Sequence, residues 1–402
     1  MDAPLSVEAP VRTPDCAPPT LKTRSQAVAT VAIAHASEVD GAARFPGEAF
    51  HAAKAQRLLG ILVPRALGGE GATVSDVADV CYELGQACGA TGMIYAMHQV
   101  KVACIVRHLH GSSALEALLR RLCNEQLLLA SSTTEGQSGG NIRSSEAPVE
   151  YQGDAFTLER KASVISYGAH ADGIVTTARR SADAAASDQV LIALLKPDYT
   201  LTRLQGWNTL GMRGTCSEGY TLKATGHRGQ IIPDPYEFIH PQTMVPFAHL
   251  LWSSVWTGIA ASATARAQAL IRKAMRQGSG QLPPGAPHYT KGLASLRTLR
   301  GMLGTSLRTY EHNMTDAKTL GSLEFQTMIT LTKVESSELA VSIVLNAMRA
   351  CGLSGYRCDS EFSIERHLRD VLSAPIMINN ERILSNLATS SLMSPIPASI
   401  SE

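Results

Sequence analysis

The order of the hydrophobic patterns along this 402-residue chain constrains its fold more than any other feature. Apolar residues return every three or four positions from residue 24 to about 128, which indicates amphipathic helices. From 129 to 235 the pattern changes to short β-branched or alternating runs between Gly, Asp, Asn and Ser, which is typical of strands. The helical period returns after 235. This order excludes the regular strand–helix alternation of a parallel α/β fold.

We therefore predict an α+β multidomain protein. Residues 1–23 are expected to form a disordered tail, 24–128 an N-terminal helical domain, 129–235 a central antiparallel β-barrel or sandwich, and 236–402 a C-terminal four-helix bundle. Helices are predicted over 26–39, 74–88, 91–109, 113–123, 245–277, 293–313, 323–351 and 365–372. Strands are predicted over 156–159, 162–165, 173–178, 189–195, 220–224 and 229–232, and a loop over 278–285.

Composition narrows the classes of partner. The chain carries 36 Lys and Arg against 35 Asp and Glu, so its net charge of +1 favours neither nucleic acid nor an anionic membrane. Eight scattered cysteines form no CxxC pair and have no histidines at zinc-finger spacing, which predicts reduced thiols in a cytoplasmic protein without a metal site. We expect no signal peptide and no membrane span, because no apolar run reaches about 20 residues.

Two polar segments in the β-like region carry the strongest chemical signal. Residues 132–141 (STTEGQSGGN) are rich in hydroxyls and glycine, and 161–172 (KASVISYGAHAD) add another hydroxyl in a β-like setting. Such a pair of segments can present N–H and O–H groups to a flat polar ring. On these residues alone, two ordinary loops at strand edges remain an equal alternative.

These segments and four others resemble the acyl-CoA dehydrogenase family, in the family's order and at similar spacing. The resemblance implies FAD held between the β-domain and the C-terminal bundle, with dimers or tetramers completing the cofactor site. The matching segments are VPRALGGEG (63–71), YELGQAC (82–88), TE with GGN (134–135 and 139–141), KASVISYGAHAD (161–172), GWNTLGMRGT (206–215) and ERHLRD (365–370).

The resemblance also assigns cofactor contacts. Thr133 and Thr134 would lie near the pyrimidine edge of the flavin, and Ser166, at a family Thr position, would reach its N5 side. Arg349, with Gly352 in the same segment, would contact the FAD diphosphate across a dimer, with Arg replacing the family's Gln.

Besides Arg349, four positions depart from the family pattern. Val164 stands in place of a Trp beside the flavin, and Gly140 replaces a Ser that helps to hold a CoA thioester. Ile378 and Leu251 align with the two family locations of the catalytic Glu, and neither side chain can take a proton.

Three residues are candidates for the missing acid or base. Glu381 is the nearest carboxylate to Ile378, although an ordinary surface carboxylate would look the same. His98 lies on an otherwise apolar helix and His249 near the start of a long one, where a core histidine and a helix-start residue are the alternatives.

The resemblance predicts a FAD-dependent oxidoreductase acting on an acyl or aminoacyl thioester, linked to CoA or to an acyl carrier protein. It would remove a proton and transfer a hydride to flavin N5. Electrons would pass to an electron-transfer flavoprotein or oxygen, or involve a flavin reductase, and the protein would be a homodimer or homotetramer. Two alternatives remain: a reduced-flavin-dependent monooxygenase, and a non-catalytic subunit of an active paralogue.

Overall fold

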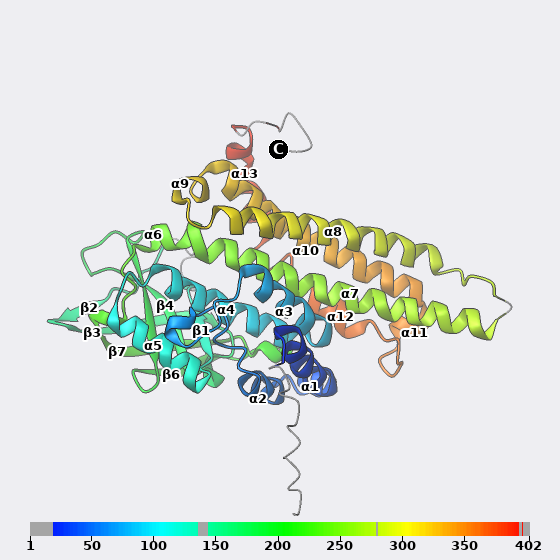
Figure 1. Cartoon of the computed structure of the whole chain (residues 1–402), viewed down its shortest axis with the longest axis horizontal. Helices are drawn as coiled ribbons and strands as arrows, with labels where there is room; N and C mark the ends of the chain where they lie inside the picture. Colours follow the sequence, from blue (N-terminus) through cyan, green and yellow to red (C-terminus); the bar gives the residue numbers. More distant parts are fainter. Residues whose placement is uncertain (1–18, 136–143, 279, 394–395, 397–402) are drawn as a thin grey trace, which may run out of the picture.

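The computed structural model describes residues 19–135, 144–278, 280–393 and 396, and it confirms the predicted α+β architecture. The predicted residues Gly139, Gly140 and Asn141 lie outside these ranges. Figure 1 shows the strands at one end of the molecule and long helices running to the other. Among the described residues, no helix is long and apolar enough to cross a bilayer.

Four of the five described N-terminal helices lie where the sequence pattern predicts them. The first begins at Leu21, before the predicted start at 26, because the Thr20 hydroxyl caps it by accepting a hydrogen bond from Thr23 N at 3.2 Å. The last three also begin and end within a few residues of the predicted bounds, whereas the helix Gly47–Ala55 was not predicted. The helices are α1 (Leu21–Gly41), α2 (Gly47–Ala55), α3 (Val74–Ala87), α4 (Gly89–His108) and α5 (Ser113–Glu125).

The central region contains two sheets, with strand orders β1-β4-β5 and β2-β3-β7-β6. The strands are β1 (Leu129–Ser132), β2 (Glu150–Gln152), β3 (Ala155–Ile165), β4 (Gly173–Arg179), β5 (Gln189–Leu195), β6 (Tyr199–Gln205) and β7 (Glu218–His227). All pairs are antiparallel except β1 with β4, which is parallel.

Three strand predictions were wrong. The two short strands predicted over 156–159 and 162–165 are one strand, β3, because the two residues between them, buried Arg160 and exposed Lys161, continue its alternating pattern. The strand predicted over 229–232 is replaced by a 3-10 turn, Arg228–Gln230, and a single bridge of Ile231 to Ile192. The sequence pattern also missed β1, β2 and β6.

The C-terminal region is helical, as predicted. The bounds of its helices α7 (Val245–Gln277) and α10 (Leu323–Cys351) are those predicted, whereas α8 (Ala286–Asn313) begins earlier and α13 (Asn380–Ser391) was not predicted. The shorter helices are α6 (Tyr236–Ile239), α9 (Ala317–Leu320), α11 (Leu353–Tyr356) and α12 (Glu365–Val371).

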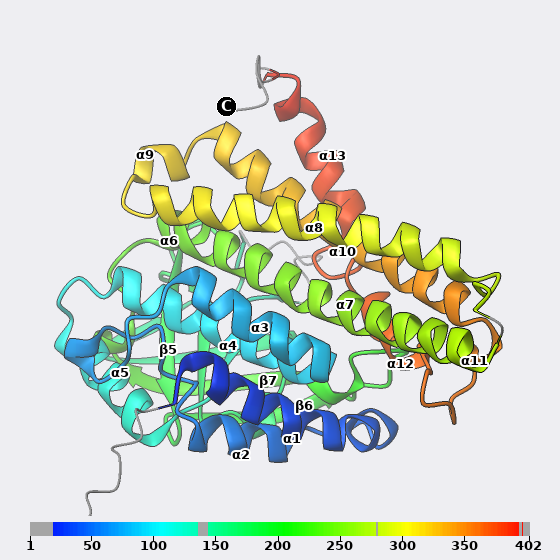
Figure 2. The ribbon, with the colours of Figure 1, turned by 45° about the vertical axis from the view of Figure 1, so that its right-hand side comes forward.

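Helix α7 joins the N-terminal and C-terminal helices into one core. Figure 2 shows it between α3 and α4 on one side and α8 and α10 on the other, and it packs against all four. The approach to α3 is close enough to require glycine, since a Cβ on Gly258 would lie 2.3 Å from the Tyr82 carbonyl oxygen. This packing places the C-terminal helices beside α4, which itself contacts β1.

Candidate functional site

The predicted hydroxyl segments lie side by side because two contacts hold them together. Glu135, just after β1, forms an isolated antiparallel bridge with Ala162 of β3. Beyond the end of β3, Tyr167 donates a hydrogen bond from its hydroxyl to the Leu129 carbonyl at 2.9 Å. Residues 130–134 therefore lie beside residues 163–166. The structure thus brings Thr133 and Thr134 to the same edge as Ser166, and all three side chains are partly exposed.

A buried ion pair fixes the first of these segments. The Glu135 carboxylate lies 3.2 Å from Arg160 Nη1 and accepts hydrogen bonds from Ser145 Oγ at 2.7 Å and Glu146 N at 2.8 Å. Arg160 also donates to Thr177 Oγ1 at 2.8 Å. Burial lowers the pKa of Arg160 to about 10, partly offset by Glu135. Because removing one partner would leave a buried charge unpaired, this pair holds the segment that carries Thr133 and Thr134.

A bulge and a chain of hydroxyls shape the second segment. The pairing of β3 with β7 shifts between Ala162 and Ile165, which leaves Val164 37% exposed beside Ser166. Ser166 Oγ lies 2.8 Å from Ser217 Oγ, which in turn lies 2.7 Å from Thr215 Oγ1. The Ser166 hydroxyl is therefore oriented by neighbours while it remains accessible.

These residues fit the polar edge of a flavin. Partly exposed hydroxyls from two segments meet at one edge, and the buried Ser132 Oγ has no hydrogen-bond partner in the part of the chain that the structure describes. Val164 adds an uncovered apolar surface without the aromatic wall of the family pattern. The edge thus supplies donors and an apolar contact for one flat, polar ring.

Arg349 and Gly352 do not join this edge within one chain. Arg349 is exposed in the last turn of α10, and Gly352 ends the helix with φ of 54°. They precede α11, which lies at the opposite end of the molecule from the strands (Figure 1 and Figure 2). The neighbouring Leu353 and Tyr356 are 73% and 74% exposed. One chain therefore presents the two halves of the predicted FAD site at separate ends.

Apolar residues occupy the two positions at which the family pattern has its catalytic glutamate. Leu251 is fully buried in α7. Ile378 lies in the loop between α12 and α13 with φ of 59°, and Asn379 follows with φ of 45°. A left-handed conformation is rare for a β-branched residue and is held only by its surroundings.

Glu381 is exposed in the first turn of α13, beside a buried polar cluster. Its neighbour Asn380 accepts a hydrogen bond from Lys333 Nζ at 2.6 Å and donates to Ser337 Oγ at 2.9 Å. Burial lowers the pKa of Lys333 to about 8, partly offset by Glu338 and Glu381. The sequence patterns did not single out Lys333. Its position among the apolar residues on the buried face of α10 is the feature that could have identified it.

Both histidines are buried and bound to backbone. His98 Nε2 donates to the Leu59 carbonyl at 2.8 Å, and its Nδ1 accepts from Leu129 N at 3.0 Å, so both ring nitrogens are occupied. Burial lowers the pKa of His98 to about 4. His249 Nδ1 donates to the Ile329 carbonyl at 3.3 Å, and burial together with Lys333 lowers the pKa of His249 to about 3. Both rings are therefore neutral near pH 7.

The chain resembles one known family and two known proteins in sequence. The family described as "Acyl-CoA dehydrogenase, N-terminal domain" matches residues 21–126. The chain is 25% identical to 3-sulfinopropanoyl-CoA desulfinase of Paraburkholderia xenovorans, covering 93% of this chain and 95% of that protein. It is also 25% identical to cyclohex-1-ene-1-carbonyl-CoA dehydrogenase of Geobacter metallireducens, covering 92% and 96%.

Solved structures share the fold at low sequence identity. FMN-bound TdsC from Paenibacillus, a dibenzothiophene monooxygenase, superposes with a TM-score of 0.83 at 16% identity over 94% of this chain and 98% of that one. Methanesulfinate monooxygenase MsuC from Pseudomonas fluorescens superposes with a TM-score of 0.79 at 16% identity, with the same coverage.

Proposed function

This chain belongs to the acyl-CoA dehydrogenase family, and we propose that it is a FAD-dependent oxidoreductase of acyl or aminoacyl thioesters carried on coenzyme A or on a carrier protein. The observation that carries the proposal is the edge where Thr133 and Thr134 lie against Ser166. Support for a thioester comes from two relatives named for acyl-CoA substrates that match this chain over almost its whole length.

In this proposal the hydroxyl edge binds and orients the cofactor. A bound flavin supplies two-electron redox chemistry to the site. Thr133 and Thr134 donate hydrogen bonds to the polar edge of the ring, where such donors stabilise negative charge. Ser166, oriented by Ser217, would donate a hydrogen bond to the same ring from the second segment. Val164 leaves room for a substrate group that the family's Trp would exclude.

The proton acceptor in this proposal is Glu381. It is the nearest carboxylate in sequence to Ile378, and it lies in the first turn of α13. Because Glu381 is exposed, the proposal requires the left-handed segment at Ile378 and Asn379 to move and bring the carboxylate to the substrate. His98 is a weaker candidate, since both of its ring nitrogens already bind backbone groups.

Anaerobic mixing of the flavin-loaded protein with acyl-CoA and aminoacyl carrier-protein thioesters tests the reaction. We expect loss of the flavin's visible absorbance on mixing, and a rate about 100-fold lower in Glu381→Gln. The matched control is Glu335→Gln, an exposed glutamate on α10, which should react as the wild type does. No bleaching by any thioester would exclude the proposed oxidation.

A second candidate is a monooxygenase that receives reduced flavin from a partner reductase. Two observations favour it: both family base positions are apolar, and the fold superposes on two monooxygenases. This candidate predicts that thioesters leave the oxidised flavin unchanged. Product would form only with an external reductase and oxygen, in an amount that matches the oxygen consumed. Failure to bind any flavin would contradict both candidates.

A further inference from the structure

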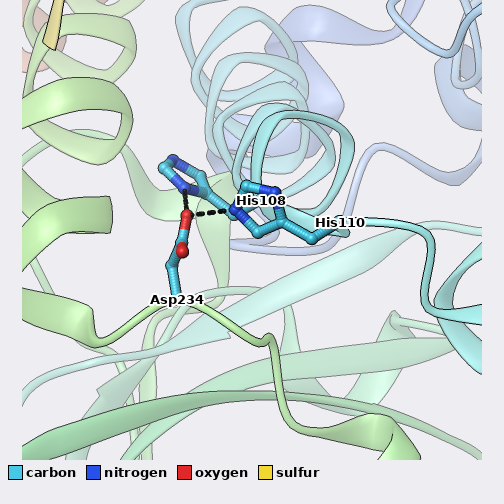
Figure 3. A group of neighbouring side chains, drawn as sticks. All are labelled: His108, His110 and Asp234. Carbon is cyan, nitrogen blue, oxygen red and sulfur yellow. Dashed lines mark hydrogen bonds and ion pairs between the residues drawn. The ribbon is translucent and has the colours of Figure 1, made fainter.

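Two histidines and a distant aspartate, residue types that can bind metal ions, meet where α4 ends (Figure 3). His108 is the last residue of α4, His110 follows two residues later, and Asp234 precedes α6. Asp234 Oδ2 lies 2.6 Å from His108 Nδ1 and 2.7 Å from His110 Nε2. One ligand atom from each residue lies within 4.8 Å of the other two.

The donor set suits a borderline transition-metal ion. Two imidazole nitrogens and one carboxylate oxygen form a common zinc ligand set, whereas Mg²⁺ and Ca²⁺ prefer oxygen ligands. Bonds of about 2.0–2.1 Å in a tetrahedron place ligand atoms about 3.3 Å apart. The carboxylate oxygen must therefore move about 0.7 Å away from His108 Nδ1 and about 0.6 Å away from His110 Nε2 to admit an ion. The side chains of Asp234 and His110 are 30% and 57% exposed and are free to make that shift.

The buried histidine is already oriented for metal binding. The His108 side chain is only 4% exposed, and its Nε2 lies 2.7 Å from Thr243 Oγ1. Arg107 Nε donates to the same hydroxyl oxygen at 3.0 Å. With a metal on Nδ1, His108 would carry its remaining proton on Nε2 and donate it to Thr243. Outer hydrogen bonds of this kind fix the ring and tautomer of a metal-binding histidine.

We infer that His108, His110 and Asp234 bind one Zn²⁺-like divalent transition-metal ion, with water in the fourth position. The ion would tie the end of α4 to the segment between β7 and α6. Through Thr243, in the π-helical turn before α7, it would also support the start of the C-terminal helices. The inference does not rest on the proposed function, because none of these residues belongs to the hydroxyl edge.

The sequence predicted no metal site because it has no Cys and His residues at zinc-finger spacing. The His-x-His pair at 108–110 is a local signal, but Asp234 lies 124 residues beyond His110. Only the tertiary fold brings the carboxylate to the pair.

The test uses the flavin-loaded full-length protein after removal of metals with a chelator and dialysis. Zn²⁺ is titrated in competition with a coloured chelator, and thermal unfolding is followed in parallel. We expect one Zn²⁺ per chain and a rise of several degrees in unfolding temperature at saturation, because the ion binds the folded state. Mg²⁺ at the same concentration should produce no rise.

Variants locate the site. His110→Ala and Asp234→Asn should each weaken Zn²⁺ binding at least 100-fold without changing flavin content. His51→Ala, which removes an exposed histidine on α2, is the matched control and should bind as the wild type does. Should Asp234→Asn fail to fold, His110→Ala still decides, since the exposed His110 ring bonds only Asp234 in the described structure. Absence of one-to-one binding in the wild type, unchanged binding in His110→Ala, or equal binding of Mg²⁺ would overturn the inference.

Discussion

The Lys333 side chain donates a hydrogen bond to Asn380 Oδ1 at 2.6 Å, in a buried site that also contains the Trp256 ring, 5.7 Å from Nζ. This contact joins α10 to the first residue of α13, two positions after Ile378. The segment that carries the base in the family pattern is thus anchored by a lysine in this chain. We therefore expect Lys333 to hold the position of the segment 378–381.

Replacing Lys333 by Met should change how stability depends on pH. Burial lowers the folded-state pKa of Lys333 to about 8, against about 10.4 when unfolded, so the unfolded chain holds more protons between these values. Stability of the wild type should therefore rise relative to Lys333→Met by about 1.5 kcal/mol from about pH 8 to about pH 9.5. Urea unfolding at both pH values measures the difference.

The control for this change is Lys291→Met, an exposed lysine on α8, whose stability should keep the slope of the wild type. If the stability of the wild type changed with pH as that of Lys333→Met does, Lys333 would not be held in a low-dielectric site. A lower rate of flavin reduction in Lys333→Met than in Lys291→Met would support a positioning role for Lys333.

Ser166→Ala should weaken flavin binding about tenfold, since one hydrogen bond to the ring is worth about 1.5 kcal/mol. Fluorescence of released flavin during dilution measures the dissociation constant. Ser163→Ala, which replaces an exposed serine near the end of β3, is the matched control and should leave the affinity unchanged. Equal effects of the two variants would remove Ser166 from the cofactor site.

Arg349→Ala should weaken FAD binding by about 10- to 100-fold, the usual worth of a charge-assisted hydrogen bond, while FMN binding stays unchanged. The reason is that Arg349 of a second copy would contact the diphosphate, which FMN lacks. Arg297→Ala, an exposed arginine on α8, is the control. Mixed oligomers of Arg349→Ala and Ser166→Ala chains should recover some tight FAD sites, and failure to do so would argue against a shared site.

His98→Gln should remove an acid-sensitive contribution to stability. The pKa of His98 is about 4 in the folded protein and about 6.5 when unfolded, so the unfolded state gains the proton first as pH falls. Between about pH 7 and about pH 5 the wild type should lose about 2 kcal/mol more than the variant, as measured by urea unfolding. The rate of flavin reduction per bound flavin should stay within about threefold, and a 100-fold loss would instead assign His98 an acid–base role.

Sequence periodicity predicted the long helices well because their signals are local. The bounds of α7 and α10 agree with the pattern, and Ser322 caps α10 by accepting a hydrogen bond from Phe325 N. Short strands such as β1 and β2 escaped prediction because three or four residues carry too little periodicity. Helix α13 was not predicted either.

The sequence by itself determined which chemical groups the chain offers: the hydroxyls of the two polar segments and the absence of a carboxylate at Ile378 and Leu251. Only the tertiary structure decided which groups meet. Glu135 reaches Ala162 across the sheet region, Lys333 reaches Asn380 over 47 residues, and Asp234 reaches His110 over 124. These contacts depend on packing between distant elements, and local patterns carry no information about such packing.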